Sequence, residues 1–178
     1  FGRPNFRSHR GSWSMRPQAQ EADVTISLEE AYRGATRSII LQTREHSPDR
    51  TFRPASQQYE VKIPAGVTEG SRIRLAKQGG VPPGGHEPAD VFLRVQIAPH
   101  PIFKFDNGDL HVEVPVTPWE AALGAKVDVP TLDGVVKMIV PPNTQGGKRC
   151  RLRGKGLPRI GGERGDLYVT VRITVPHS

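Results

Sequence analysis

The sequence predicts a mostly β protein with two tandem, similar small β-sandwich lobes, each with one short helix, joined by a short linker. The 178 residues include 19 Gly and 17 Pro, a content that favours many short strands and turns over long helices. Three blocks of sequence also occur twice, in the same order. Repetition in a chain of this length indicates two small lobes rather than one large domain.

The first repeated block predicts a strand followed by one short helix. In "ADVTISLEEAYRG", Val24 and Ile26 alternate as in a strand, Ser27 and Glu30 have the spacing of a capping box, and Gly34 is a helix stop. The block "VEVPVTPWEAALGA" repeats this pattern 90 residues later and places a proline at the first helical position. Each lobe is therefore expected to begin with a strand and a helix.

The second repeated block predicts a corner between two strands. "IPAGVTEGSRIRL" starts at residue 63 and returns at residue 140 as "VPPNTQGGKRCRL". A strand ends at Pro64, which cannot donate a hydrogen bond to a ladder, and the two glycines that follow turn the chain. Ile73 and Leu75 then alternate with Arg72 and Arg74, which we expect to point outward.

The spacing of the copies locates an insertion and the boundary between the lobes. The third block, "DVFLRVQI" at residue 90 and "DLYVTVRI" at residue 166, repeats after 76 residues. The drop from 90 residues predicts a long exposed hairpin or loop within "TREHSPDRTFRPASQQ" of the first copy. Asn107 and Gly108 predict a tight hairpin turn between apolar strands. We expect a flexible basic linker over residues 1–21, a first lobe over 22–105 and a second over 106–178.

The net charge of +7 is concentrated in two segments. Residues 1–17 contain four arginines and no acid, and residues 148–164 contain seven basic residues against one glutamate. Arg149, Arg151 and Arg153 alternate on a predicted strand, so they should share one face with Lys155 beside them. This pattern indicates either phosphate contacts with DNA or a solvated strand face.

Composition argues against several other classes of protein. No apolar run approaches the roughly 18 residues that cross a bilayer. Cys150 is the only cysteine and the six histidines lack metal-ligand spacing, so we assign no metal, no cofactor and no catalytic residue. With 6% aromatic residues, the chain shows no stacking platform for a sugar. We expect a cytoplasmic binding protein that is not an enzyme and does not contact membranes; nucleoid association is a second location consistent with DNA binding.

Taken together, "SLEEAYRGATRSI", "VKIPAGVTEGSRIRL", "APHPIFKFDNGDLHVEVPVTPWEAALGAKVDVPTLDG" and "GKGLPRIGGERGDLYVTVRI" resemble the C-terminal substrate-binding region of DnaJ family co-chaperones. The resemblance covers roughly residues 22–176 and is closest to class B, which lacks a zinc-binding insert, notably the bacterial curved-DNA-binding protein A type. The chain has neither the His-Pro-Asp tripeptide of a J domain nor the cysteines of a zinc module. The lead "FGRPNF" resembles the end of the family's Gly/Phe-rich linker.

The resemblance implies that unfolded client polypeptide binds to the first lobe as an added strand beside an apolar groove. Carried over position by position, it places eight residues at the peptide site: Val24, Ile26, Arg37, Ile39, Leu41, Val91, Leu93 and Phe103. Each apolar member could instead be ordinary core. The resemblance also implies a DnaK-type chaperone as partner and a homodimer for the full-length protein, with this fragment expected to be monomeric because it stops at "VPHS". The alternative is non-specific DNA binding through Arg149, Arg151, Arg153 and Lys155.

Overall fold

A computed structural model describes residues 20–46, 52–80 and 88–176. The first lobe contains β1 (Gln20–Ile26), α1 (Leu28–Arg33), β2 (Ala35–His46), β3 (Phe52–Ile63), β4 (Arg72–Leu75) and β5 (Val91–Ile97). The second lobe contains β6 (Lys104–Asp106), β7 (Asp109–Val116), α2 (Pro118–Leu123), β8 (Ala125–Thr131), β9 (Gly134–Val140), β10 (Arg149–Leu152) and β11 (Leu167–Ile173). Most of the predicted linker therefore lies outside the described residues.

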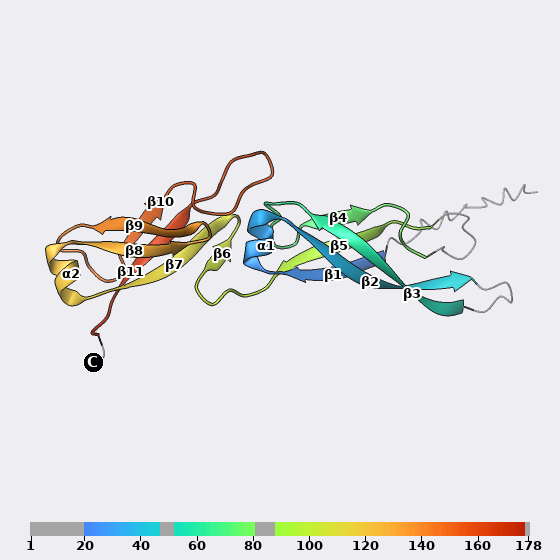
Figure 1. The fold of residues 1–178 in the computed structure, drawn as a ribbon, viewed down its shortest axis with the longest axis horizontal. Coiled ribbons are helices and arrows are strands. Elements are labelled where there is room, and N and C mark those ends of the chain that lie inside the picture. The colour runs from blue at the N-terminus through green and yellow to red at the C-terminus, as the bar shows by residue number, and fades with distance from the viewer. Residues whose placement is uncertain (1–19, 47–51, 81–87, 177–178) are drawn as a thin grey trace, which may run out of the picture.

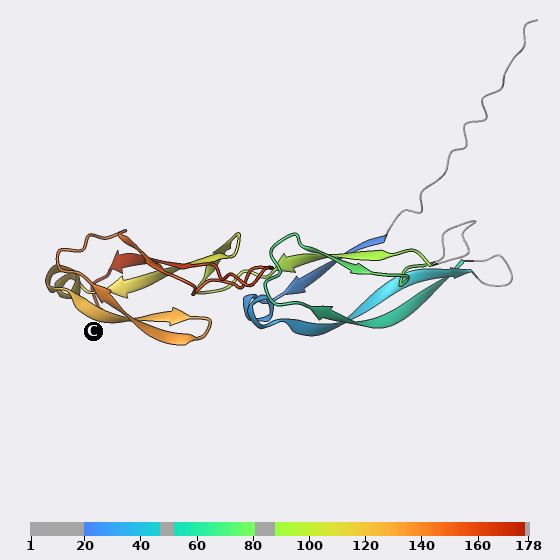
Figure 2. The ribbon, with the colours of Figure 1, turned by 90° about the horizontal axis from the view of Figure 1, so that it is seen from above.

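Each lobe pairs a larger sheet with a two-stranded hairpin, which confirms the predicted mostly β fold with one short helix per lobe. The first lobe has the sheet β1-β5-β4 and the hairpin β2-β3. The second has the sheet β10-β11-β7-β6 and the hairpin β8-β9. Figures 1 and 2 show the lobes end to end, with α1 at their junction and α2 at the far end of the second lobe.

The two helices begin with the predicted capping boxes. The Ser27 hydroxyl accepts a hydrogen bond from the Glu30 N–H at 3.2 Å, and the Ser27 N–H donates to Glu30 Oε2 at 2.8 Å. Thr117 and Glu120 make the same two bonds at the start of α2. These bonds satisfy N–H groups that have no partner inside a helix, so even six-residue helices have a defined start.

Both predicted hairpins are present. Asn107 and Gly108 have φ values of 48° and 92°, the left-handed conformation that a two-residue turn requires, and they join β6 to β7. In the first lobe β2 and β3 are 12 residues long, against seven for β8 and β9. The insertion therefore lengthens a hairpin, whose tip at 47–51 lies outside the described residues. β6 pairs with β7, so the second sheet already includes residues 104 and 105.

The repeated corner confirms the predicted strand, loop and strand, and it contains a repeated ion pair that the sequence did not reveal. Arg74 Nε and Nη2 donate to Asp90 Oδ2 at 2.9 and 2.6 Å, while the Lys77 N–H donates to Asp90 Oδ1 at 2.9 Å. In the second lobe Arg151 Nε donates to Asp166 Oδ2 at 2.7 Å, and the Gly154 N–H donates to Oδ1 at 2.9 Å. We call this arrangement the Arg–Asp clasp. It fastens the turn after a short strand to the start of the neighbouring strand.

The Arg–Asp clasps should make the protein sensitive to acid. The Gly154 N–H and Arg151 hold the pKa of Asp166 below its usual value, and the Lys77 N–H and Arg74 lower the pKa of Asp90. A carboxyl group with a lower pKa in the folded state contributes stability at neutral pH that is lost as the pH falls through its titration range. The urea midpoint should therefore fall between about pH 5 and pH 2. Asp166→Asn should be less stable at pH 7 and should flatten that fall; an unchanged pH profile would contradict the assignment.

Buried side chains form two separate core clusters. The first contains nine buried residues of the first lobe, including Val24, Ile63, Leu93 and Val95. The second contains 15 buried residues, mainly from β7, β8, β9 and β11. Leu28, the first residue of α1, is 1% exposed and belongs to the second cluster although its chain position is in the first lobe.

Further contacts of α1 reinforce this junction. His100 Nε2 lies 2.9 Å from Glu29 Oε1, while His100 Nδ1 accepts the N–H groups of Ile102 and Phe103. The Tyr32 hydroxyl bonds to the Asp133 carboxylate. Arg164 Nη1 donates to the same hydroxyl at 3.0 Å, and its guanidinium lies 5.5 Å from the centre of the Tyr32 ring. The lobes are thus fastened through α1 as well as through the connecting segment.

Candidate functional site

Four of the predicted peptide-binding residues lie in the core of the first lobe. Val24 is 7% exposed, and Ile26, Val91 and Leu93 are each 1% exposed. β1 and β5 pair in parallel, with Val24 opposite Val95 and Ala22 opposite Leu93, so these four side chains lie on the inner face of the sheet. A bound peptide could reach these side chains only if the lobe opened. Phe103 is also buried, but it packs in the core cluster of the second lobe.

Ile39 and Leu41 differ from these four because each is only half-buried. Both pack against the first core cluster, whereas Ile40, between them, points to the other face and is 69% exposed. The repeat provides a direct comparison, because Val129 and Thr131 occupy the corresponding positions of β8 in the second lobe. They are 0% and 9% exposed. At these positions the first lobe therefore leaves apolar side chains partly exposed, whereas the second lobe buries the corresponding side chains.

Arg37, the predicted rim cation, is exposed but already has a charged partner. Its Nη2 donates to Glu30 Oε2 at 2.8 Å, and this bond lowers the pKa of Glu30. The positive charge at this end of β2 is therefore largely compensated by α1.

The four residues predicted to contact DNA differ in their exposure and in their contacts. Arg149 lies over the Tyr168 ring, with its guanidinium carbon 6.0 Å from the ring centre. Arg151 is held by Asp166 in the Arg–Asp clasp. Arg153 is exposed and Lys155 is half-buried. Arg149 and Arg151 alternate on β10, whereas Arg153 lies in the turn after it, and both strand arginines have a partner within the second lobe.

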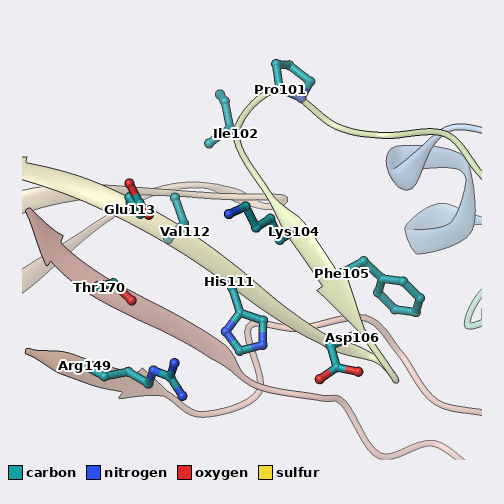
Figure 3. Close-up of a pocket in the computed structure, with 10 residues that line it drawn as sticks. All are labelled: Pro101, Ile102, Lys104, Phe105, Asp106, His111, Val112, Glu113, Arg149 and Thr170. Atoms are coloured by element: carbon teal, nitrogen blue, oxygen red, sulfur yellow. The ribbon is translucent and has the colours of Figure 1, made fainter. Parts of the chain in front are cut away.

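The second lobe has a cavity of about 650 Å³ that the sequence did not reveal. It lies where β6 meets β7 and extends toward β10 and β11 (Figure 3). Its lining mixes charged and apolar groups, among them Ile102, Lys104, His111, Glu113 and Arg149. None of the eight predicted peptide-site residues lines it. The residues come from four strands and a loop, so local sequence patterns could not have grouped them.

The sequence argues against a metal site and against a membrane-spanning segment. Within residues 20–46, 52–80 and 88–176, no three His, Cys, Asp or Glu side chains are grouped so as to hold a metal ion. No helix in that part of the chain is long and apolar enough to span a membrane.

Comparison with known proteins indicates the family of this chain. The model of the DnaJ C terminal domain matches residues 20–176. A protein named Curved DNA-binding protein from Coxiella burnetii (strain RSA 493 / Nine Mile phase I) is 47% identical over 170 residues, which is 94% of this chain and 53% of the relative. Proteins of the same name from Pseudomonas syringae pv. tomato and Pseudomonas putida KT2440 are 39% and 41% identical over 98% and 96% of this chain, and 56% and 54% of the relatives.

The chain spans about half the length of the curated relatives it matches. The family match covers all the described residues of both lobes. The family is of chaperone type and is not enzymatic. The repeated β-sandwich fold and these matches agree, and the chain belongs to the DnaJ C-terminal domain family, with relatives named Curved DNA-binding protein.

Proposed function

We propose that the chain binds unfolded or extended polypeptide through the first lobe and acts as part of a co-chaperone of a DnaK-type chaperone. The observation that supports this most is the difference between the lobes. Ile39 and Leu41 keep apolar surface exposed, whereas Val129 and Thr131 at the equivalent positions are closed. β2 belongs to a two-stranded sheet, so its outer side has no strand partner among the described residues. An unpaired strand beside apolar side chains is suited to strand addition.

The strength of such binding can be bounded. Four or five added strand hydrogen bonds contribute about 1 kcal/mol each, and two buried apolar side chains about 1.5 to 3 kcal/mol each. Association itself costs roughly 4 to 15 kcal/mol. One site should therefore bind an extended segment with a dissociation constant in the micromolar range or weaker, which suits a protein that releases its client to a partner.

Ile39→Asp should weaken binding of an unfolded client about 10- to 100-fold, because the client then loses one apolar contact of about 1.5 to 3 kcal/mol. Fluorescence anisotropy with a labelled, permanently unfolded polypeptide measures the change. Ile40→Asp is the matched control, since Ile40 is adjacent in sequence but points to the other face and is 69% exposed. Equal affinity of a folded Ile39→Asp variant and the unmodified chain would contradict this site.

Non-specific DNA binding is a second candidate function. The relatives are named Curved DNA-binding protein, and the exposed Arg149 and Arg153 lie on the basic strand β10 and in the turn after it. Cations in such positions would contact phosphates rather than base edges, so binding would depend strongly on salt. This candidate does not exclude client binding, because the proposed residues lie in the other lobe.

Arg153→Ala should weaken DNA binding and reduce the slope of log K against log salt by about 1, because one phosphate contact is lost. Arg33→Ala, an exposed arginine in the first lobe, is the matched control. Arg151 is unsuitable for this test because its loss would break the Arg–Asp clasp. A salt slope that does not change in Arg153→Ala would remove this residue from the DNA site.

A further inference from the structure

The outer face of the larger sheet in the second lobe carries a row of cationic and aromatic side chains. Lys104 of β6 pairs with His111 of β7, and His111 pairs with Tyr168 of β11. The rings of His111 and Tyr168 stack with their centres 5.3 Å apart, and the guanidinium carbon of Arg149 on β10 lies 6.0 Å from the centre of the Tyr168 ring. The residues on either side of His111 and Tyr168 are buried in the core, so this row faces away from it.

The first lobe has a similar row, but its arginine is paired with an acid. Arg72 lies 5.1 Å from the centre of the Phe92 ring and forms an ion pair with Glu21. Glu21 stands 90 residues before His111, the separation of the two capping boxes, so a histidine replaces the carboxylate in the second lobe. Among the described residues no carboxylate forms an ion pair with Arg149. The second lobe therefore presents an exposed cation at a position that the first lobe neutralises.

The cavity of about 650 Å³ opens beside this row, and its volume is typical of sites for small ligands. Its lining includes Ile102, His111 and Arg149 together with the carboxylate of Glu113. In the described part of the chain that carboxylate has one ionic contact, with Arg172 Nη1 at 3.9 Å, and both side chains are more than half exposed. An exposed pair at this distance contributes little. The carboxylate is therefore available to accept hydrogen bonds from a ligand in the cavity.

These side chains match the parts of a nucleotide that carries guanine. An imidazole ring and an aliphatic side chain are suited to pack against a planar base, as in proteins that bind single strands. Guanine is the base whose Watson–Crick edge has two adjacent donors, the ring N1–H and the exocyclic amino group, and the two oxygens of Glu113 can accept both. Arg149 and Lys104 supply positive charge for the phosphates on either side of the base.

A single strand fits this face better than a duplex or a free nucleotide. A base in a duplex is stacked and paired, so its Watson–Crick edge cannot reach Glu113, whereas a single strand presents that edge. Cationic residues also continue past the cavity, since Lys148 before β10 and Arg153 in the turn after it are exposed. They extend the cationic surface over more than one phosphate, which a strand can use and a free nucleotide cannot.

We infer that the outer face of the second lobe binds single-stranded nucleic acid and holds one guanine base in the cavity, with the base against His111 and its donor edge on Glu113. This inference goes beyond both proposed functions, because neither client binding in the first lobe nor phosphate contacts with duplex DNA involves a base. Arg149 and Arg153 are shared with the DNA candidate, whereas His111 and Glu113 are not. Substitutions at the latter two residues therefore test the base site alone.

Fluorescence anisotropy with labelled oligonucleotides at low salt tests the base site. The probe is a single strand of about ten thymidines with one central guanine, and the matched probe carries hypoxanthine, which lacks the exocyclic amino group, in its place. The guanine strand should bind about three- to tenfold more tightly. Equal affinity for the two strands would overturn the inference. Tighter binding of a duplex of the same sequence would also overturn it and would leave the DNA candidate intact, whereas absence of binding to any nucleic acid would overturn both.

Glu113→Gln should remove the preference for guanine over hypoxanthine, because an amide offers one acceptor oxygen in place of two. Asp23→Asn is the matched control, since Asp23 stands at the corresponding position of β1, 90 residues earlier, and is also exposed. This control should keep the preference. Thermal unfolding checks that both variants are folded. A preference that persists in Glu113→Gln would overturn the inference.

His111→Glu gives the second lobe the residue type that the first lobe has at this position. The introduced carboxylate should pair with Arg149, as Glu21 pairs with Arg72, and should repel phosphates. Affinity for the guanine strand should therefore fall about tenfold or more. His111→Phe keeps a ring for stacking and should retain the affinity to within about threefold. Equal affinity of a folded His111→Glu variant and the unmodified chain would overturn the inference.

Discussion

Leu93→Asp should unfold the first lobe rather than weaken a binding contact. Leu93 is 1% exposed on β5, the middle strand of its sheet. The substitution removes about 1.5 to 3 kcal/mol of apolar burial and places a carboxylate where its burial costs several kcal/mol more. The thermal midpoint should drop sharply, or the signal of the first lobe should be lost at 25 °C, when unfolding is followed by circular dichroism and NMR.

Arg94→Asp is the control for that experiment because Arg94 is the next residue on β5 but is exposed. It should change the thermal midpoint little. If Leu93→Asp unfolds the first lobe and Arg94→Asp does not, a loss of client affinity in Leu93→Asp reports the unfolded lobe rather than a lost contact with the client. If Leu93→Asp kept the midpoint of the unmodified chain, the assignment of this residue to the core would be wrong.

Gly165→Ala should destabilise the second lobe by about 3 kcal/mol or more, a large value for the addition of one methyl group. A Cβ atom at this position would lie 2.1 Å from the Gly108 carbonyl oxygen and 2.7 Å from its carbon. Both neighbours are backbone atoms and cannot move aside as a flexible side chain would. The Gly108 carbonyl also accepts the Leu157 N–H at 2.9 Å, and the Gly165 N–H donates to the Leu157 carbonyl at 2.8 Å, so three segments would have to shift together.

Gly146→Ala provides the matched comparison for this prediction. A Cβ atom there would lie 3.8 Å from the nearest atoms, which belong to the Ile173 side chain, an ordinary contact. Urea denaturation should give nearly the same free energy of unfolding for Gly146→Ala and the unmodified chain, and a much lower value for Gly165→Ala. Similar values for both variants would show that the close approach of Gly108 and Gly165 has been misplaced.

The parts of the fold that depend on neighbouring residues were predictable from the sequence. Ser27 with Glu30 determined where α1 begins, and Asn107 with Gly108 determined the turn between β6 and β7. Each structure is stabilised by groups that lie within a few residues of one another. The repeat then extended these local assignments to a two-lobe fold without information about distant contacts.

The contacts that join distant segments were not predictable in this way. Leu28, the first residue of α1, continues the alternation of Val24 and Ile26 in β1, yet it packs in the core of the other lobe. Arg151 looked like a free basic residue because its partner, Asp166, is 15 residues away. The recurrence of an aspartate after both "R-x-R" strands was a usable signal, since Arg74 and Asp90 form the same clasp.

The candidate peptide site was also only partly predictable from the sequence. Alternation on β1 and β5 predicts which side chains face inward, but it cannot separate the floor of a binding surface from a closed core. Val24, Ile26, Val91 and Leu93 are buried, whereas Ile39 and Leu41 keep part of their side chains exposed. That distinction depends on which distant segments pack over the strands, and alternation within a strand carries no information about them.

The position of Leu28 has a consequence for how the molecule unfolds. α1 continues the chain of the first lobe, but its Leu28 side chain is buried among residues of the second, and Tyr32 and Glu29 hold the same boundary through Asp133, Arg164 and His100. Unfolding of either half would remove apolar contacts and hydrogen-bond partners from the other half. We therefore expect the unfolding of the two halves to be coupled, so that a ligand bound to one half also stabilises the other.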